Sequence, residues 1–268
     1  MAGCFLCFFW FLEGSTVWGI GLGIAFGAVW LACYRPPLFK KPWLWAVLVS
    51  SAFLTLAAIS FIQIPLVNLF YGETTRSWLW SHQVLGRLVF LAGIPLLKGL
   101  IQEGAKLVPV VFWWRRSGKN IDPKLGLAIG AVAGAGFGIF EAQWALHYMF
   151  AYGFPGWGSL WMLFGVVNGF WGTFFTVAAQ IAFSAVVGYG LARGRGWQFY
   201  LIASALHGLL DMALRIFPGS TYFIYGNPTA SLGASVYTAV LASLVTAWAL
   251  WLRWRKTKTT ADPEISSM

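Results

Sequence analysis

Continuous apolar stretches, rather than alternating apolar and polar positions, dominate this chain. A helix needs about 20 mostly apolar residues to cross the hydrocarbon core of a bilayer. Seven stretches reach that length, and their continuity excludes an outer-membrane barrel, whose strands alternate. The pattern predicts an all-α, polytopic transmembrane helical bundle of about seven spans, at residues 16–34, 43–66, 85–113, 125–152, 160–191, 197–216 and 230–252.

The composition supports this fold class. Hydrophobic residues make up 59% of the chain and charged residues only 10%, whereas an average soluble domain is about 25% charged. So little polar surface excludes a soluble globular domain, and so many apolar residues exclude a disordered chain. We predict one transmembrane domain over residues 1–254 and a polar cytoplasmic tail over residues 255–268.

Basic residues alternate between the predicted loops. Lys and Arg number 18 against 8 acidic residues, and the basic ones cluster after the first, third, fifth and seventh spans. The positive-inside rule therefore predicts an outside N-terminus and a cytoplasmic C-terminus. Beside apolar segments, such residues indicate contacts with membrane lipid headgroups, and we expect no nucleic-acid partner. The basic groups are Arg35, Lys40 and Lys41; Arg115, Arg116, Lys119 and Lys124; Arg193 and Arg195; and Arg253, Arg255, Lys256 and Lys258.

Cysteine usage gives little support for a metal or redox centre. The chain has three cysteines, Cys4, Cys7 and Cys33, all in or beside the first span. The C-x-x-C formed by the first two has no second pair to complete a zinc site. We expect no metal and no cofactor.

Ionisable side chains inside the predicted spans are the main candidates for function. Such a group is costly in a membrane unless it is paired or hydrated, so it is a functional hypothesis by default. Residues three or four apart share one face of a helix. Three pairs have this spacing: Glu103 and Lys106 in the third span, Phe137 and Glu141 in the fourth, and His207 and Asp211 in the sixth.

The depths of these groups are compatible with a common site. At about 1.5 Å per residue, Glu103 lies roughly 15–18 Å from the basic edge at Arg115. His207 lies about 15 Å from the edge at Trp197, and Glu141 lies roughly 24 Å from the start of its span. We expect the third, fourth and sixth spans to converge on one buried polar cavity.

A purely structural interpretation of the same residues stays open. Polar side chains also hold transmembrane helices together, and basic residues such as Arg87 and Lys98 neutralise carboxylates or snorkel. In this interpretation Glu103 pairs with Lys106, Asp211 with Arg215, Glu141 with Gln143 or Asn168, Gln180 joins helices, and His207 is a satisfied core side chain.

The three pairs resemble motifs of the PrsW family of intramembrane proteases, which is related to the CAAX protease and bacteriocin-processing superfamily of glutamic-type membrane endopeptidases. Members of that family carry E-E-x-x-K, F-x-x-x-E and H-x-x-x-D on separate transmembrane helices, in that order. The order and spacing match over about the middle half of the chain. The matching positions are Gln102, Glu103 and Lys106, then Phe137 and Glu141, then His207 and Asp211.

The resemblance implies a peptidase of a prokaryotic inner membrane that cleaves a membrane-anchored peptide or protein. A carboxylate, Glu103 with Glu141 nearby, would deprotonate a water molecule. His207 would assist this base or polarise the scissile carbonyl, and Asp211 would orient the imidazole. Lys106 would balance the carboxylate charge.

The chain departs from the family at Gln102, which replaces the first Glu of the E-E pair. Glutamine does not accept a proton at neutral pH, so a general base at this position is lost. Either Glu103 or Glu141 takes that role, or the chain is a non-catalytic scaffold or accessory subunit that binds another membrane protein or a lipid. A proton-relaying transporter is less favoured, because no inverted repeat is visible.

Overall fold

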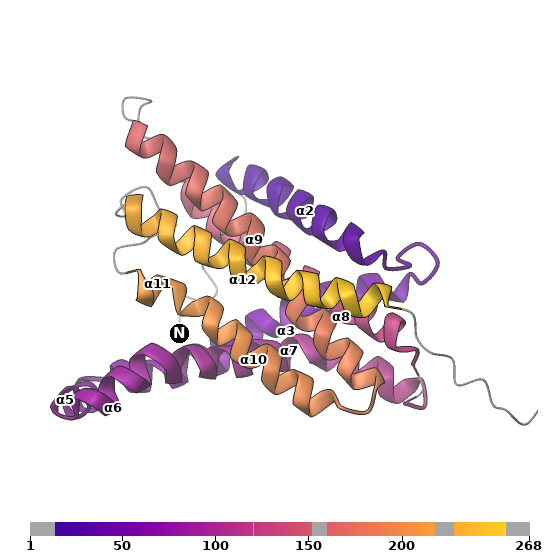
Figure 1. Ribbon diagram of the computed structural model, residues 1–268, viewed down its shortest axis with the longest axis horizontal. Coiled ribbons are helices and arrows are strands. Elements are labelled where there is room, and N and C mark those ends of the chain that lie inside the picture. The colour runs from indigo at the N-terminus through magenta and orange to yellow at the C-terminus, as the bar shows by residue number, and fades with distance from the viewer. Residues whose placement is uncertain (1–13, 120, 152–159, 218–227, 256–268) are drawn as a thin grey trace, which may run out of the picture.

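The computed structural model describes residues 14–119, 121–151, 160–217 and 228–255. All regular elements of these residues are helices, so the predicted all-α polytopic bundle is confirmed (Figure 1). Six helical stretches within this part are long and apolar enough to cross a membrane. The helices are α2 (Gly14–Tyr34), α3 (Trp43–Ala58), α4 (Ile64–Tyr71), α5 (Glu73–Ser81), α6 (Gln83–Leu88), α7 (Ile94–Arg116), α8 (Pro123–Ala151), α9 (Leu160–Ala192), α10 (Gly196–Asp211), α11 (Ala213–Ile216) and α12 (Pro228–Trp254).

The sixth predicted span differs most from the prediction. It consists of α10 and the short α11, which meet at Met212. The 16 residues of α10 rise about 24 Å, which is less than the roughly 30 Å hydrocarbon core. This shortfall explains why six stretches qualify by length, whereas the sequence predicts seven spans. The predicted orientation of the termini stays a prediction, and Cys4, Cys7 and residues 256–268 lie outside the described residues.

Two short π-helical segments interrupt the second and third spans. They are η2 (Ile59–Gln63) and η3 (Val89–Gly93), and an Ile-Pro pair follows each of them directly. Proline lacks a backbone N–H and crowds the preceding turn, so the hydrogen-bond ladder widens there. Beyond these segments, α4, α5 and α6 project from the bundle (Figure 1). The helix α5 is an addition to the prediction, which placed a loop between residues 66 and 85.

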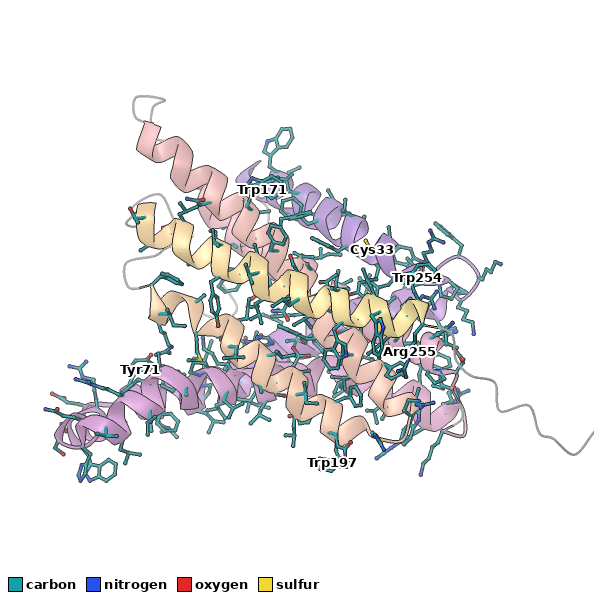
Figure 2. The ribbon with its side chains drawn as sticks, in the orientation of Figure 1. Cys33, Tyr71, Trp171, Trp197, Trp254 and Arg255 are labelled. Carbon is teal, nitrogen blue, oxygen red and sulfur yellow. The ribbon has the colours of Figure 1, made fainter. Side chains whose placement is uncertain are left out.

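The centre of the bundle is the pair α8 and α9, which pack along each other. Small residues bring them close: a Cβ atom at Gly134 would clash with the backbone carbonyl of Gln180. Around this pair, α2 and α3 pack on α8, while α12 and α10 pack on α9. Large apolar side chains such as Trp171 and Trp197 are exposed on the outside (Figure 2), as expected for surfaces that face lipid.

The helices α7 and α10 form a second close contact, which positions the candidate site. A Cβ atom at Gly99 would clash with the carbonyl of Ser204, so glycine is required for this approach. Both helices also lie against α9. The third, fifth and sixth predicted spans therefore meet, and α8, the fourth, contacts both α7 and α9.

Candidate functional site

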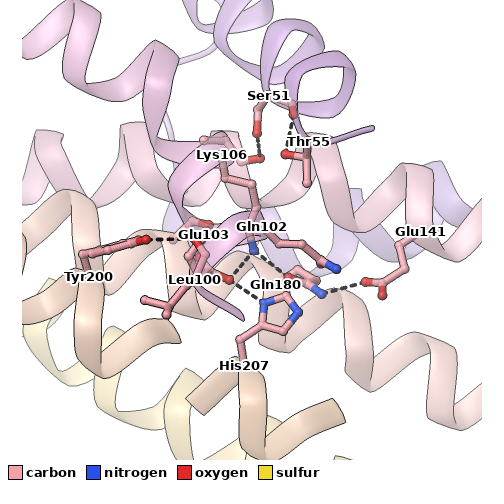
Figure 3. Close-up of polar contacts among 12 residues, drawn as sticks. Ser51, Thr55, Leu100, Gln102, Glu103, Lys106, Glu141, Gln180, Tyr200 and His207 are labelled. Carbon is pink, nitrogen blue, oxygen red and sulfur yellow. Dashed lines mark hydrogen bonds and ion pairs between the residues drawn. The ribbon is translucent and has the colours of Figure 1, made fainter. Parts of the chain in front are cut away.

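Glu103 is the centre of a buried polar cluster (Figure 3). Its Oε1 atom accepts hydrogen bonds from Lys106 Nζ at 2.5 Å and from His207 Nδ1 at 2.7 Å. Its Oε2 atom accepts a longer one, 3.4 Å, from Ser184 Oγ. Lys106 comes from the same helix, His207 from α10 and Ser184 from α9. Three helices thus converge on one carboxylate.

The cluster continues from Lys106 to α8. Lys106 Nζ donates to Gln180 Oε1 at 2.6 Å, and Gln180 Nε2 donates to Glu141 Oε2 at 2.7 Å. The amide oxygen of Gln180 binds a cation and its nitrogen binds a carboxylate. These two contacts therefore determine which end of the amide is the oxygen and which is the nitrogen. An unbroken chain of side chains therefore joins His207, Glu103, Lys106, Gln180 and Glu141 (Figure 3).

All side chains of this hydrogen-bonded series except Glu141 are almost fully buried. Glu103 and Lys106 are 0% exposed and His207 is 1% exposed, whereas Glu141 is half-buried. A buried ion pair is tolerated only when further hydrogen bonds satisfy its remaining donors and acceptors. The Lys106 ammonium has two oxygen partners, and it also lies 5.4 Å from the centre of the buried Phe137 ring. Phe137, in the F-x-x-x-E pattern, therefore contacts the cation of the cluster.

One carboxylate oxygen of Glu141 has no hydrogen-bond partner in the part of the chain that the structure describes. Gln180 binds its Oε2, whereas Oε1 accepts no hydrogen bond from the residues that the structure describes. Glu141 is thus the member of the chain that combines partial exposure with a free acceptor atom, which is what a water-binding group requires.

Asp211 lies at the partly exposed edge of the cluster. Its Oδ2 atom is 3.3 Å from Lys98 Nζ, and the two side chains are 25% and 31% exposed. The sequence suggested that Asp211 orients His207, but Glu103 makes the contact with Nδ1 of the imidazole. The suggested partner Arg215 instead donates to the Tyr71 hydroxyl. Lys98 neutralises a carboxylate, which is one of the two roles expected for it.

Gln102 faces away from Glu103. Its Nε2 atom donates to Gln63 Oε1 at 2.8 Å, and both side chains are buried. Its Oε1 atom is buried without a hydrogen-bond partner. Gln63 is the last residue of η2, so the π-helical register decides which residue meets Gln102. The position where the family has its first Glu therefore contacts the second span and not the Glu103 cluster.

Two members of this arrangement, Gln63 and Ser184, were not among the candidates from sequence. Gln180 was expected to join helices, but its link between Lys106 and Glu141 was not predicted. Gln180 and Ser184 are four residues apart, and this spacing places them on one face of α9. A search for all polar residues at i,i+4 spacing inside the apolar spans would have found this pair. No comparable spacing marks Gln63.

The described residues contain no group of three or more His, Cys, Asp or Glu side chains close enough to hold a metal ion. No protein-family model, curated protein or solved structure matches the chain. The contacts of the cluster and the motif resemblance therefore carry the functional proposal.

Proposed function

We propose that the protein is an intramembrane peptidase of the PrsW-like type, which cleaves a membrane-anchored peptide or protein with a carboxylate-activated water. One observation carries the proposal: the Glu103–His207 hydrogen bond is part of a continuous polar chain that ends at the free oxygen of Glu141. Single polar contacts between transmembrane helices are enough to hold the helices together. A chain of five side chains from four helices, three of them ionisable and almost fully buried, is costly without a chemical use.

Glu141 is the proposed general base. Glu103 already accepts three hydrogen bonds, and Lys106 and His207 occupy the same oxygen atom. Glu141 holds Gln180 with one oxygen and has the other free for water. In the proposed reaction Glu141 takes a proton from water, the water oxygen bonds to the scissile carbonyl carbon, and the peptide C–N bond then breaks. The same proton passes to the departing amine nitrogen.

His207 is the proposed electrophilic group. Because Glu103 binds Nδ1, the imidazole is fixed with Nε2 as its remaining polar atom. In its protonated form, Nε2–H would donate to the oxygen of the scissile carbonyl, where negative charge develops. Glu103 then stabilises the imidazolium, and Lys106 and Gln180 hold Glu103 and Glu141 in place.

A non-catalytic role as a membrane scaffold or accessory subunit is the second candidate, and a specific contact favours it. Gln102 does not supply a base, and its side chain donates a hydrogen bond to Gln63. A chain that had lost the catalytic Glu would show this replacement while keeping the ion pair between Glu103 and Lys106 for stability.

Cleavage of a membrane-anchored peptide separates these candidates. The purified protein is reconstituted into vesicles with a set of single-span peptides that carry a quenched fluorophore. The peptidase proposal predicts turnover by the wild type and a loss of about 10²–10⁴-fold in Glu141→Gln. Glu73→Gln, on the exposed turn at the start of α5, is the matched control and should retain full activity. Equal turnover by both variants would contradict the proposal, and no turnover by the wild type would favour the scaffold.

A further inference from the structure

A separate cavity of about 760 Å³ lies at the end of the bundle that carries the basic loops. It lies between the start of α8, the turn that joins α9 to α10, and the end of α12, near the Arg255 label in Figure 2. None of the residues that line it belongs to the Glu103 cluster. Its polar lining is mainly basic, from Arg193, Arg195 and Arg255, and its aromatic lining comes from Tyr189, Phe199 and Trp248.

The charge balance of this cavity is positive. The carboxylate in its wall belongs to Asp122, and that group is already engaged, because Oδ2 accepts the backbone N–H groups of Lys124 and Leu125 at 2.9 and 3.0 Å. It therefore acts as a cap for the first turn of α8. Arg193, Arg195 and Arg255 line the cavity and form no ion pair with this carboxylate among the described residues.

Arg255 is held in position before any ligand binds. Its Nη2 atom donates to the Tyr189 hydroxyl. Its guanidinium lies 5.3 Å from the centre of the Tyr189 ring and 5.1 Å from that of Trp251. Stacking of this kind fixes the plane of a guanidinium and leaves its other N–H groups available. Arg193 and Arg195 are exposed and line the cavity from the turn that joins α9 to α10.

We infer that this cavity binds a phosphate-bearing anion, either the headgroup of an anionic phospholipid or a free phosphate ester. Guanidinium groups match phosphate oxygens in two-point hydrogen bonds, and the volume lies within the range of about 300–1,000 Å³ that is usual for small-molecule sites. Basic pockets between membrane helices on the cytoplasmic side bind anionic lipid headgroups. The basic loops predict that this end of the bundle is the cytoplasmic one. The inference is independent of the peptidase proposal, because the two sites share no residue.

Lipid and phosphate binding to the full-length protein tests this inference. Native mass spectrometry of the detergent-solubilised protein measures binding of phosphatidylglycerol and phosphatidylcholine, and calorimetry measures binding of inorganic phosphate. The cavity variant is Arg193→Gln/Arg195→Gln. Both side chains are exposed, so the fold does not depend on them. The matched control is Arg115→Gln/Arg116→Gln, which removes the same charge from exposed residues at the same end of the bundle but outside the cavity.

Each cavity arginine is expected to contribute about fivefold to the affinity for an anionic lipid. The cavity variant should therefore bind phosphatidylglycerol about 25-fold more weakly than the wild type, and the control should remain within twofold. If inorganic phosphate binds and shows the same dependence on the variants, the site takes free phosphate esters. If only the lipid does, the ligand is a headgroup. Equal losses in both variants, or unchanged binding in the cavity variant, would overturn the inference.

Discussion

His207 on α10 is bound through Nδ1 to Oε1 of Glu103 on α7, at 2.7 Å and with both side chains almost fully buried. The two residues are 104 positions apart. The contact depends on the close approach of the two helices at Gly99. It gives the imidazole one fixed orientation, and this orientation is the basis for the roles proposed above.

Loss of the imidazole should abolish cleavage but leave the fold intact. We expect His207→Ala to lower kcat by about 10²–10⁴-fold, as removal of a group that acts on the reacting atoms does. Glu103 keeps its ion pair with Lys106 in this variant, so the protein should still fold. Its melting temperature should fall, because a buried hydrogen bond is lost and a void is left. His82→Ala, at an exposed position, is the control. A fall in activity that only follows a fall in folded protein would show that His207 is structural.

Removing only one partner of the ion pair between Lys106 and Glu103 should strongly lower the free energy of unfolding. Lys106→Met leaves a buried carboxylate without its cation, and such changes destabilise proteins by about 3–5 kcal/mol. The double variant Lys106→Met/Glu103→Gln removes both charges and should regain much of this loss. Unfolding titrations measure both values. Lys98→Met, at a partly exposed ion pair, should cost less. Equal costs for Lys106→Met and Lys98→Met would contradict the buried arrangement.

Placing at position 102 the Glu that the resembling PrsW proteases carry there should have little effect. The side chain of Gln102 points to Gln63, so the carboxylate in Gln102→Glu would lie beside η2 rather than beside water held by Glu141. We expect cleavage to change less than about tenfold, well below the contribution of a general base. Gln102→Leu serves as the control without a polar group. A large gain in Gln102→Glu alone would place the base at position 102 and would contradict the role of Glu141.

The basic loops predict the orientation of the chain, and reporter fusions test this prediction. A reporter fused after Trp254 should read as cytoplasmic, and one inserted at Arg76 in the projecting α5 should read as outside. The first result would also place the arginine-lined cavity at the inner surface. The reverse pair of results would contradict the predicted topology.

The sequence predicts the spans well because long apolar runs have one stable arrangement in a bilayer. The predicted starts at residues 43 and 160 and the predicted ends at residues 34 and 216 coincide with helix bounds, and most others lie within a few residues. The pairing of Glu103 with Lys106 was also readable, because both lie on one helix. The proximity of Glu141 to the cluster was expected too. The sequence did not indicate that the amide of Gln180 connects Glu141 to Lys106.

Contacts between helices were harder to predict, for a physical reason. Spacing along one helix fixes which residues share a face, but not how that face is rotated against a neighbour. The partner of Asp211 therefore proved to be Lys98, and the π-helical turn of η2 brings Gln63 to Gln102. Neither rotation nor a π segment leaves a periodic signal in the apolar pattern.

Cleavage in water labelled with heavy oxygen tests the proposal that Glu141 activates the attacking water. Mass spectrometry of the products shows whether the new carboxyl terminus carries oxygen from water. We expect labelled products from the wild type and from Glu73→Gln, and a loss of about 10²–10⁴-fold in the rate of Glu141→Gln. Labelled products formed at the same rate by Glu141→Gln would contradict this proposal.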